Sequence, residues 1–481
     1  MKNKTAYKNK LMDKKYSDGS WHLRAARNFI ALGLTSLLVG AIPFVVQAQK
    51  GWHHLFDGKS LSGWKIVGKD ADFKVEEGLI VGTMKKGLPN AFLVTEKEYG
   101  DFVLEVEFKL EGNTTNSGVQ VRSHIDPEGN KGYGRVFGPQ VEIDPTPRSW
   151  TGGLYDEGRR GWIYPLDLNE KAKSAYKLEE FNTLRIEALG AELRSWVNGV
   201  PASHFIDTMR REGIIALQIH SIPDELDGKR VFFRQVRIQT GKFKASPLNP
   251  DVYVVNVQPN VLSETEKKAG YNLLFDGNSV GQWRSVKGPD FPDRGWKVSD
   301  GALQVLKADG GESTNGGDII TKDRYAVFDL SFEFKLTPGA NSGVKYFVTL
   351  KEQTQGSAIG LEYQILDDAT HPDAKLGRAG NRTLASLYDL ITSNREERAR
   401  RPIGQWNRGR IVVTADNQVF HYLNGMLMLQ YKRGSKEFKD LVALSKYKDW
   451  EAFGEAATGH ILLQDHGDAV SFRSIKVKKI K

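Results

Sequence analysis

The segment Leu55-Phe56-Asp57-Gly58, with Trp64 shortly after it, returns in the second half of the chain as Leu274-Phe275-Asp276-Gly277 with Trp283. Four further matches follow in the same order: apolar residues alternating with polar ones at 101–110 and 325–336, Asn-Ser-Gly-Val at 116–119 and 341–344, an aromatic residue leading to Asn-Gly at 196–199 and 422–425, and Leu-Gln-x-His at 217–220 and 463–466. Chance does not preserve the order of so many motifs. The chain is therefore interpreted as two copies of one domain, at residues 50–240 and 271–481, joined by a proline-containing linker at 241–270.

Each copy has the sequence pattern of an all-β domain. About ten short stretches per copy are typical of strands, and many of them are separated by Asn-Gly or Asp-Gly turns. Helical periodicity is scarce, so we expect helix only near 168–180, 263–269 and 434–447. This pattern predicts a sandwich of two sheets in each copy, of the kind whose concave sheet forms a groove for an elongated ligand.

Residues 1–48 have the composition of a signal peptide. A cationic beginning is followed by an apolar run from Phe29 to Val46 and by small residues at Val46 and Ala48. The alternative is a membrane anchor, because this run is at the lower limit of a bilayer span. Cleavage before Gln49 predicts a periplasmic or secreted protein with no membrane insertion after cleavage.

The charge of the chain gives no support for nucleic-acid binding. The formal net charge is +9, but eight basic and two acidic residues fall within 1–48, so the rest of the chain carries about +3. A nearly neutral surface lacks the electrostatic attraction that nucleic-acid binding requires. The chain has no cysteine, so its stability cannot depend on disulfides.

At these motifs the chain resembles the 3-keto-disaccharide hydrolase domain family, formerly a domain of unknown function. The resemblance covers both copies. The motifs that carry it are Leu-Phe-Asp-Gly with its Trp, Asn-Ser-Gly-Val, Gly-Leu-Glu-Tyr-Gln-Ile-Leu-Asp-Asp at 360–368 with Leu-Tyr at 387–388, and Leu-Gln-x-His. It implies tandem concanavalin A-like jelly-roll β-sandwich domains that act on sugars whose C3 hydroxyl has been oxidised to a ketone.

A ketone at C3 makes an unusual cleavage chemistry accessible. It acidifies the hydrogen on C2, because the resulting carbanion is stabilised as an enolate. A base can then remove that proton, the C1 substituent leaves by elimination, and water adds afterwards. Such a site needs a base, hydrogen-bond donors for the enolate oxygen and an acid for the leaving group.

Two rows of polar residues in the first copy have the spacing of a strand face. Gln140, Glu142 and Asp144 alternate with apolar residues, and Gln218 and His220 are likewise two apart. We predict Glu142, His220 and Asp144 as catalytic residues, with Gln140 and Gln218 binding substrate. A solvated strand face would produce the same row. No compact set of metal ligands is present, so we expect no cofactor, with a divalent metal beside His220 as the open alternative.

Three further residues of the first copy are predicted to bind substrate. Arg122 follows the Asn-Ser-Gly turn, where its cation would polarise a ketone or enolate oxygen, although an exposed cross-strand charge would look the same. Tyr155 and Trp162 lie in the glycine-rich segment 152–162, and either ring could stack on a sugar. Because copy two has Phe347 at the position of Arg122, we regard copy one as the preferred catalytic unit.

The second copy departs from this arrangement. Alignment from its Gly360 puts Glu362 at the position of Gln140 and Gln364 at that of Glu142, so the acid and the amide are exchanged. The two sites therefore cannot have identical chemistry. The substrate-binding residues predicted in this copy are Glu362, Gln364, Tyr388, Gln464 and His466.

The leading functional hypothesis is an exported carbohydrate-active hydrolase, or lyase/hydratase, that cleaves 3-keto-glycosides by removal of the C2 proton and elimination of the C1 substituent. The principal alternative is a non-catalytic, lectin-like carbohydrate-binding protein, because the same sandwich serves both classes. A third possibility, an ordinary glycosidase, requires two acids about 5–10 Å apart across the sugar.

Overall fold

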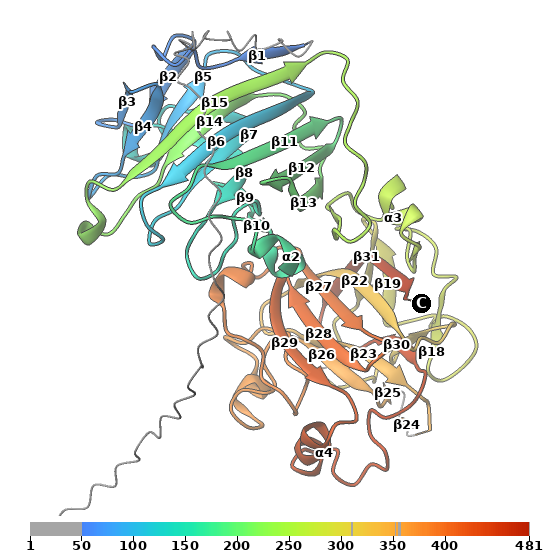
Figure 1. Ribbon diagram of the computed structural model, residues 1–481. Helices are drawn as coiled ribbons and strands as arrows, with labels where there is room; N and C mark the ends of the chain where they lie inside the picture. Colours follow the sequence, from blue (N-terminus) through green and yellow to red (C-terminus); the bar gives the residue numbers. More distant parts are fainter. Residues whose placement is uncertain (1–50, 309–310, 352, 355–356, 481) are drawn as a thin grey trace, which may run out of the picture. The chain divides into compact units, whose positions relative to one another are not determined.

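The computed structural model describes residues 51–308, 311–351, 353–354 and 357–480. The signal peptide expected at 1–48 lies outside the described residues. Strands make up most of the regular structure, and no helix in the described part is both long and apolar enough to cross a membrane. Two groups of strands are visible, coloured blue to green and yellow to red (Figure 1).

The first half is a sandwich of two antiparallel sheets. One sheet has the strand order β13-β12-β11-β6-β15-β4-β3, with β1 also paired to β15, and the other has the order β10-β9-β8-β7-β14-β5-β2. The strands are β1 (Trp52–His54), β2 (Trp64–Val67), β3 (Asp72–Glu76), β4 (Leu79–Thr83), β5 (Ala91–Thr95), β6 (Phe102–Leu110), β7 (Ser117–Asp126), β8 (Arg135–Ile143), β9 (Leu154–Glu157), β10 (Gly161–Tyr164), β11 (Asn182–Leu189), β12 (Glu192–Val197), β13 (Val200–Ile206), β14 (Ile214–Ile219) and β15 (Arg230–Thr240).

The second half repeats the same strand order. Its sheets run β29-β28-β27-β22-β31-β20-β19, with β17 on β31, and β26-β23-β30-β21-β18. The strands are β17 (Tyr271–Leu273), β18 (Trp283–Ser285), β19 (Trp296–Ser299), β20 (Ala302–Val305), β21 (Ile319–Thr321), β22 (Phe328–Leu336), β23 (Asn341–Val348), β26 (Leu361–Leu366), β27 (Asn407–Val413), β28 (Gln418–Leu423), β29 (Met426–Lys432), β30 (His460–Leu463) and β31 (Val470–Lys479), together with a small hairpin of β24 (Gln353–Thr354) and β25 (Ser357–Ala358). The predicted all-β fold of two tandem jelly-roll sandwiches is thus confirmed.

The repeated motifs make the same contacts in each half. The Ser117 hydroxyl donates to the Gln218 carbonyl over 2.7 Å, and the Ser342 hydroxyl donates to the Gln464 carbonyl over 2.8 Å. These bonds tie β7 to β14 and β23 to β30, the central pairs of the two equivalent sheets. The Asn-Ser-Gly and Leu-Gln-x-His motifs are therefore neighbours in space in both halves.

The alternation along β6 shows how the sequence builds a sandwich layer. Phe102, Leu104, Val106 and Phe108 are fully buried in the core, whereas the acidic residues between them are only half-buried. Burial of each such apolar side chain contributes about 1.5–3 kcal/mol to folding. Of the acidic residues, Glu107 pairs with Arg234 over 2.6 Å.

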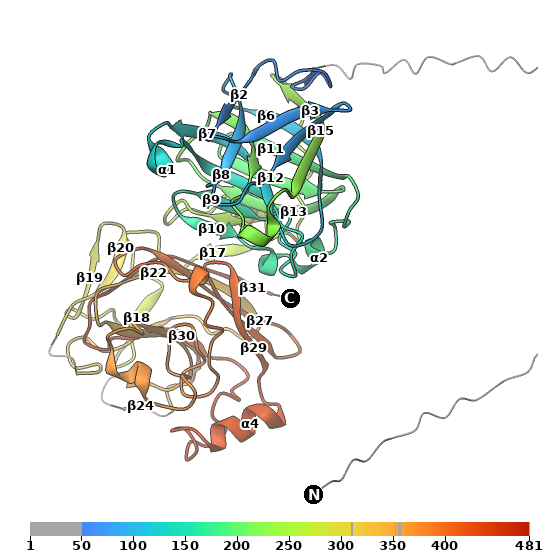
Figure 2. The ribbon, with the colours of Figure 1, turned by 90° about the vertical axis from the view of Figure 1, so that its left-hand side faces the viewer.

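Helices are short, and those labelled in Figure 2 lie outside the sheets. They are α1 (Gly129–Gly132), α2 (Glu170–Lys173), α3 (Glu264–Lys268) and α4 (Lys436–Ala443), with 3-10 turns at Leu166–Leu168, Asp224–Leu226, Pro372–Lys375 and Glu397–Ala399. The linker contains α3, which starts with a capping box of Ser263 and Glu266 as the pattern at 263–269 predicts, and β16 (Val255–Asn256), which pairs with β13. The helix expected at 168–180 is wrong beyond Lys173, because the Asn182 amide bonds both backbone groups of Lys177 and holds that segment as a loop.

Candidate active site

A cavity of about 530 Å³ opens on one sheet of the first half. Its lining is mostly polar, with two aromatic rings, which suits a sugar-sized ligand better than an apolar one. Residues of the first half that line it are Asn90, Asn116, Gln140, Glu142, Arg148, Tyr155, Glu157, Gly161, Trp162 and His220. The structure therefore brings five of the predicted site residues into one cavity: Gln140, Glu142, Tyr155, Trp162 and His220.

The sheet order explains why these residues meet. Gln140 and Glu142 lie on β8, Tyr155 on the adjacent β9 and Trp162 on β10, while His220 directly follows β14, on the other side of β7. Side chains two residues apart share a face of a strand, and neighbouring strands align these faces into one surface. Three members of the period-two rows recognised in the sequence, Gln140, Glu142 and His220, thus line the cavity.

Glu142 is a carboxyl group held away from water. It is 4% exposed, and burial raises its pKa from 4.5 to about 8, against the opposing effect of a hydrogen bond from Gln140 Nε2 to its Oε2 over 2.9 Å. Desolvation disfavours the charged form of an acid. Glu142 is therefore largely protonated at neutral pH and can donate a proton.

Glutamine side chains extend from Gln140 in a buried network. Gln140 Nε2 lies 3.2 Å from Gln218 Oε1, and Gln120 Nε2 donates to Gln140 Oε1 over 3.3 Å. Asn116 Oδ1, Gln120 Oε1 and Gln218 Nε2 are buried and have no hydrogen-bond partner among the described residues. Because buried polar atoms are almost always bonded, such a cluster is typical of a surface that receives polar groups of a ligand.

His220 is the histidine of the cavity. It is half-buried, and its Nδ1 lies 2.5 Å from the Ser221 carbonyl oxygen, so Nδ1 donates and Nε2 keeps its lone pair. Burial lowers the pKa of His220 below 6.5, with the Ser221 hydrogen bond acting in the opposite direction. At neutral pH the imidazole is therefore uncharged and able to accept a proton.

Asp144 and Gln218 stand behind the cavity rather than in its lining. Asp144 is fully buried and forms an ion pair with Arg148 over 2.7 Å, while its other oxygen accepts the backbone N–H of Thr146. The Arg148 guanidinium does line the cavity, with its Cζ 4.7 Å from the ring centre of Trp150. Asp144 thus positions a cation, a different placement from the direct contact that its strand spacing suggested.

The prediction that Arg122 binds substrate needs correction, because this side chain does not line the cavity. It is 1% exposed and donates to the carbonyl oxygens of Gly100 and Gly190 and to the Asp101 carboxylate over 2.7–3.0 Å. The strand pairing shifts between Gln120 and residue 124, and Arg122 itself has φ +48°. This bulge turns the side chain away from the face that carries Gln120, so Arg122 is a structural residue.

The second half has a cavity at the equivalent place, with a volume of about 340 Å³. Its lining includes all five residues predicted for this copy, Glu362, Gln364, Tyr388, Gln464 and His466, together with Glu312, Asn341, Lys345, Ile359, Gly360, Lys446, Tyr447 and Trp450. In the strand pairing Glu142 lies opposite Gly118, whereas Gln364 lies opposite Gly343. The exchange of acid and amide between the two copies is therefore a structural fact.

The amide–carboxyl pair survives this exchange. With its amide turned to satisfy both polar atoms, Gln364 donates to Glu362 Oε1 over 3.1 Å, as Gln140 donates to Glu142. Glu362 is also buried, and burial raises its pKa while nearby Lys345 opposes that rise. Lys345 occupies the position of Gln120, so the second cavity has a buried cation where the first has an amide.

Sequence reasoning missed the two lysines of the second cavity. Lys345 lies one residue beyond the recognised Asn-Ser-Gly-Val motif and is 3.7 Å from Asp318 Oδ2. Lys446 follows α4 in an insertion of this copy, residues 433–459 between β29 and β30, where the first half has only residues 207–213. Its Nζ lies 4.3 Å from the ring centre of Tyr388. The period-two continuation from Gly343 to Lys345 was a usable signal, but nothing in the sequence connects the insertion to the cavity.

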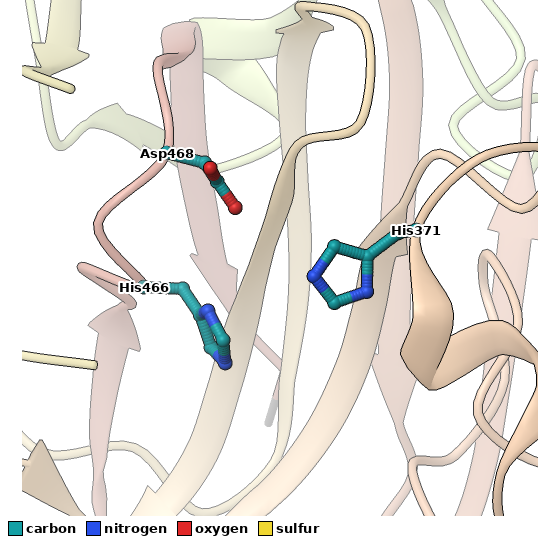
Figure 3. Close-up of side chains that lie close together, drawn as sticks. All are labelled: His371, His466 and Asp468. Carbon is teal, nitrogen blue, oxygen red and sulfur yellow. The ribbon is translucent and has the colours of Figure 1, made fainter. Parts of the chain in front are cut away.

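One group beside the second cavity has the donor types of a metal site. Ligand atoms of His371, His466 and Asp468 all lie within 4.8 Å of one another. The two rings point toward a common space, and the carboxylate of Asp468 lies above His466 (Figure 3). Two imidazoles and one carboxylate are a set that divalent transition metals bind.

Both halves of the chain match a known protein family. The family model of the 3-keto-alpha-glucoside-1,2-lyase-like domain matches residues 51–239 and again residues 270–478. A curated relative, the 3-keto-disaccharide hydrolase of Bacteroides thetaiotaomicron, is 37% identical over 230 residues, which make up 44% of this chain and 78% of the relative.

Solved structures with similarity to the chain include sugar-related proteins. A candidate glycosyl hydrolase of Parabacteroides distasonis is 29% identical and is covered completely by 47% of this chain, with a TM-score of 0.40. The carbohydrate-binding module CBM66 of Bacillus subtilis is 15% identical, covers 37% of this chain and 96% of its own, and has a TM-score of 0.26.

Proposed function

Because the chain belongs to the family of the 3-keto-alpha-glucoside-1,2-lyase-like domain, we propose that it is a hydrolase of 3-keto-glycosides, including 3-keto-disaccharides. The observation that carries this proposal concerns two groups in the first cavity, because the protein raises the pKa of one and lowers the pKa of the other. Glu142 is held protonated and His220 is held neutral at the same pH. Such divergence separates a general acid from a general base.

His220 is the proposed base. Its Nε2 takes the C2 proton of the bound 3-keto sugar, and the electron pair moves toward the C3 oxygen to give an enolate. The Arg148 guanidinium, fixed by Asp144, supplies positive charge in the cavity for that oxygen. Arg148 thereby takes the role that the sequence suggested for Arg122.

Glu142 is the proposed acid. As the enolate collapses, the C1–O bond breaks and the Glu142 proton goes to the departing oxygen, which leaves as an alcohol. Water then adds to C1 of the unsaturated ketone while a proton returns to C2, so the net reaction is hydrolysis. Tyr155 and Trp162, both in the cavity lining, provide ring faces for the sugar.

The test compares a 3-keto-disaccharide with its unoxidised parent in D₂O. We expect the protein to release monosaccharide from the keto sugar alone, with one deuterium at C2 of the product. Release without deuterium, or equal release from the parent, would mean direct displacement by two carboxylic acids such as Glu142 and Glu157, both of which line the cavity. Binding of the sugar with no release would indicate the lectin-like alternative.

The assignment of acid and base is tested with two variants and one matched control. Glu142→Gln and His220→Ala should each lower turnover by about 10²–10⁴. Glu362→Gln changes the corresponding cavity of the second half and should leave turnover by the first half unchanged. If Glu362→Gln instead abolishes turnover while the first two variants stay active, the reaction belongs to the second half.

We further propose that the protein acts in the cell envelope or outside the cell, as two domains at residues 50–240 and 271–481. The support is the order of cationic, apolar and small residues in 1–48. Sequencing of the mature N-terminus from the envelope fraction should find a start near Gln49. An intact Met1 in the membrane fraction would mean an anchor.

A further inference from the structure

Beside the second cavity lies a group of potential metal ligands, and no such group is found beside the first among the described residues. His371 and His466 face each other with ring centres 6.0 Å apart and planes at 85°, and Asp468 follows His466 by two residues (Figure 3). The donor atoms of the three side chains are within 4.8 Å of one another. Side-chain rotations that move these atoms by about 1 Å bring them to the separations found around a bound metal, where each metal–ligand bond is about 2.0–2.2 Å long.

An unpartnered buried atom points to the same place. His466 Nδ1 is buried and has no hydrogen-bond partner among the described residues. Buried ring nitrogens are normally bonded to protein, to water or to an ion. A metal–nitrogen bond would satisfy the ring of His466.

The surrounding backbone bonds two of the three ligands, and only its contact to Asp468 favours coordination. Asp468 Oδ2 accepts the N–H of Asn341 over 3.0 Å, which leaves its other oxygen available and orients the carboxylate. His371 Nδ1 accepts the N–H of Asp373 over 3.2 Å. Coordination through Nε2 of His371 requires the proton on Nδ1, so the ion must displace this long hydrogen bond.

The first copy has an arginine in the corresponding place. Asp144 and Asp367 each accept the backbone N–H two residues further on, over 3.1 Å in both cases. Four residues after these aspartates the first copy has Arg148 and the second has His371. Two residues after the shared histidine, the first copy has Ile222 in place of Asp468. The first copy thus has a fixed cation and an apolar residue where the second has two potential ligands.

We propose that the second half binds one divalent transition-metal ion of the Zn²⁺ class through His371, His466 and Asp468, in the place that the Arg148 guanidinium takes in the first half. Nitrogen and carboxylate donors suit Zn²⁺ and its neighbours in the first row better than Mg²⁺ or Ca²⁺. Three protein ligands leave coordination positions open for water or for an oxygen of a sugar in the cavity. Each cavity then has one positive group beside its histidine, supplied by a side chain in one copy and by an ion in the other.

The test measures metal binding by the full chain, with no sugar present, so that its outcome is independent of the proposed reaction. Protein stripped with a chelator is dialysed against Zn²⁺ or Co²⁺, and bound metal is counted by mass spectrometry. We expect one ion per chain. With Co²⁺ we also expect a visible absorption band of the kind given by an ion with a low coordination number. Mg²⁺ at the same concentration should not compete.

Three variants locate the ion. His371→Arg and Asp468→Ile install the residues of the first copy, and each should weaken binding at least 100-fold while the metal-free protein melts like the parent. His220→Ala, the matched histidine of the first copy, should leave one ion bound. If either second-copy variant fails to fold, His371→Gln replaces it. No bound ion in the parent, or an ion that survives both second-copy substitutions, overturns the proposal.

Discussion

Replacing Glu142 by glutamine should stabilise the protein at neutral and alkaline pH while removing its activity. Glutamine has the shape of the protonated carboxyl, and its amide oxygen can still accept the hydrogen bond from Gln140. The wild-type carboxyl has a pKa of about 8 in the folded state against 4.5 when exposed. Because the pKa is higher in the folded protein, the protonated Glu142 contributes fully to the unfolding free energy of the wild type below the unfolded pKa of 4.5. This contribution is lost as the pH rises through the folded pKa of about 8.

The magnitude follows from that window. Each pH unit between 4.5 and 8 costs the wild type about 1.4 kcal/mol relative to a neutral side chain. The variant should therefore gain about 3.5 kcal/mol of unfolding free energy over the wild type between pH 5 and pH 8, slightly less than three full steps because the curve flattens near both pKa values. Its turnover of a 3-keto-glycoside should fall by about 10²–10⁴, because the leaving group loses its proton donor.

Urea unfolding, followed by tryptophan fluorescence from pH 5 to pH 8, measures this difference. Glu76→Gln, at an exposed carboxylate of the same half, is the control and should follow the wild type at every pH. If Glu142→Gln shows the same pH dependence as the wild type, Glu142 is ionised in the folded protein and is not the acid.

Three further outcomes are expected. The pH profile of kcat/KM should be bell-shaped. The value should fall below pH 6.5, where His220 becomes protonated, and again around pH 8, where Glu142 ionises. A flat profile over this range would exclude both assignments. His220→Ala should lose turnover by about 10²–10⁴ at an unchanged melting temperature, and a lowered melting temperature with retained turnover would make it a structural residue. Arg122→Ala should lower the unfolding free energy by about 2–4 kcal/mol, because a buried side chain is removed and two partly buried carbonyl oxygens lose their donor. The protein that remains folded should keep the kcat/KM of the wild type.

The fold was predictable because the information lies in the order of local motifs. Leu-Phe-Asp-Gly is a turn in both halves, where Asp57 and Asp276 each accept two backbone N–H groups. The indole nitrogens of Trp64 and Trp283 bond the carbonyl oxygens of the leucines that begin these motifs. Contacts of this kind span a few residues, so a repeated pattern in the sequence implies a repeated structure.

The site was predictable only as far as strands keep their regular alternation. Gln140, Glu142 and His220 follow that alternation, and the structure places them in the cavity. Arg122 does not, because a bulge changes which face the strand presents after Gln120. Phe347 has the same positive φ, 55°, at the matching step of the second copy, but no residue type marks the bulge in either sequence.

Part of the site depends on the packing of distant segments. Arg148 enters the first cavity because Asp144 pairs with it, and Lys446 enters the second from an insertion. Neither placement follows from spacing along the chain. Contacts between loops are set by the three-dimensional path of the backbone, which the spacing of residues along a single sequence does not reveal.

The exchanged acid and amide have a consequence for how the duplicated protein has diverged. A step of two residues along a strand moves a side chain by about 6.6 Å, which is several bond lengths of a sugar ring. A sugar held in the same orientation by both cavities would therefore meet the carboxyl group at a different atom in each copy. The two copies differ by the exchange of two residues: Gln140 and Glu142 in the first correspond to Glu362 and Gln364 in the second. The hydrogen bond between amide and acid is present in both. Duplication followed by this swap has placed the carboxyl group at two different positions in one polypeptide without rebuilding either sheet.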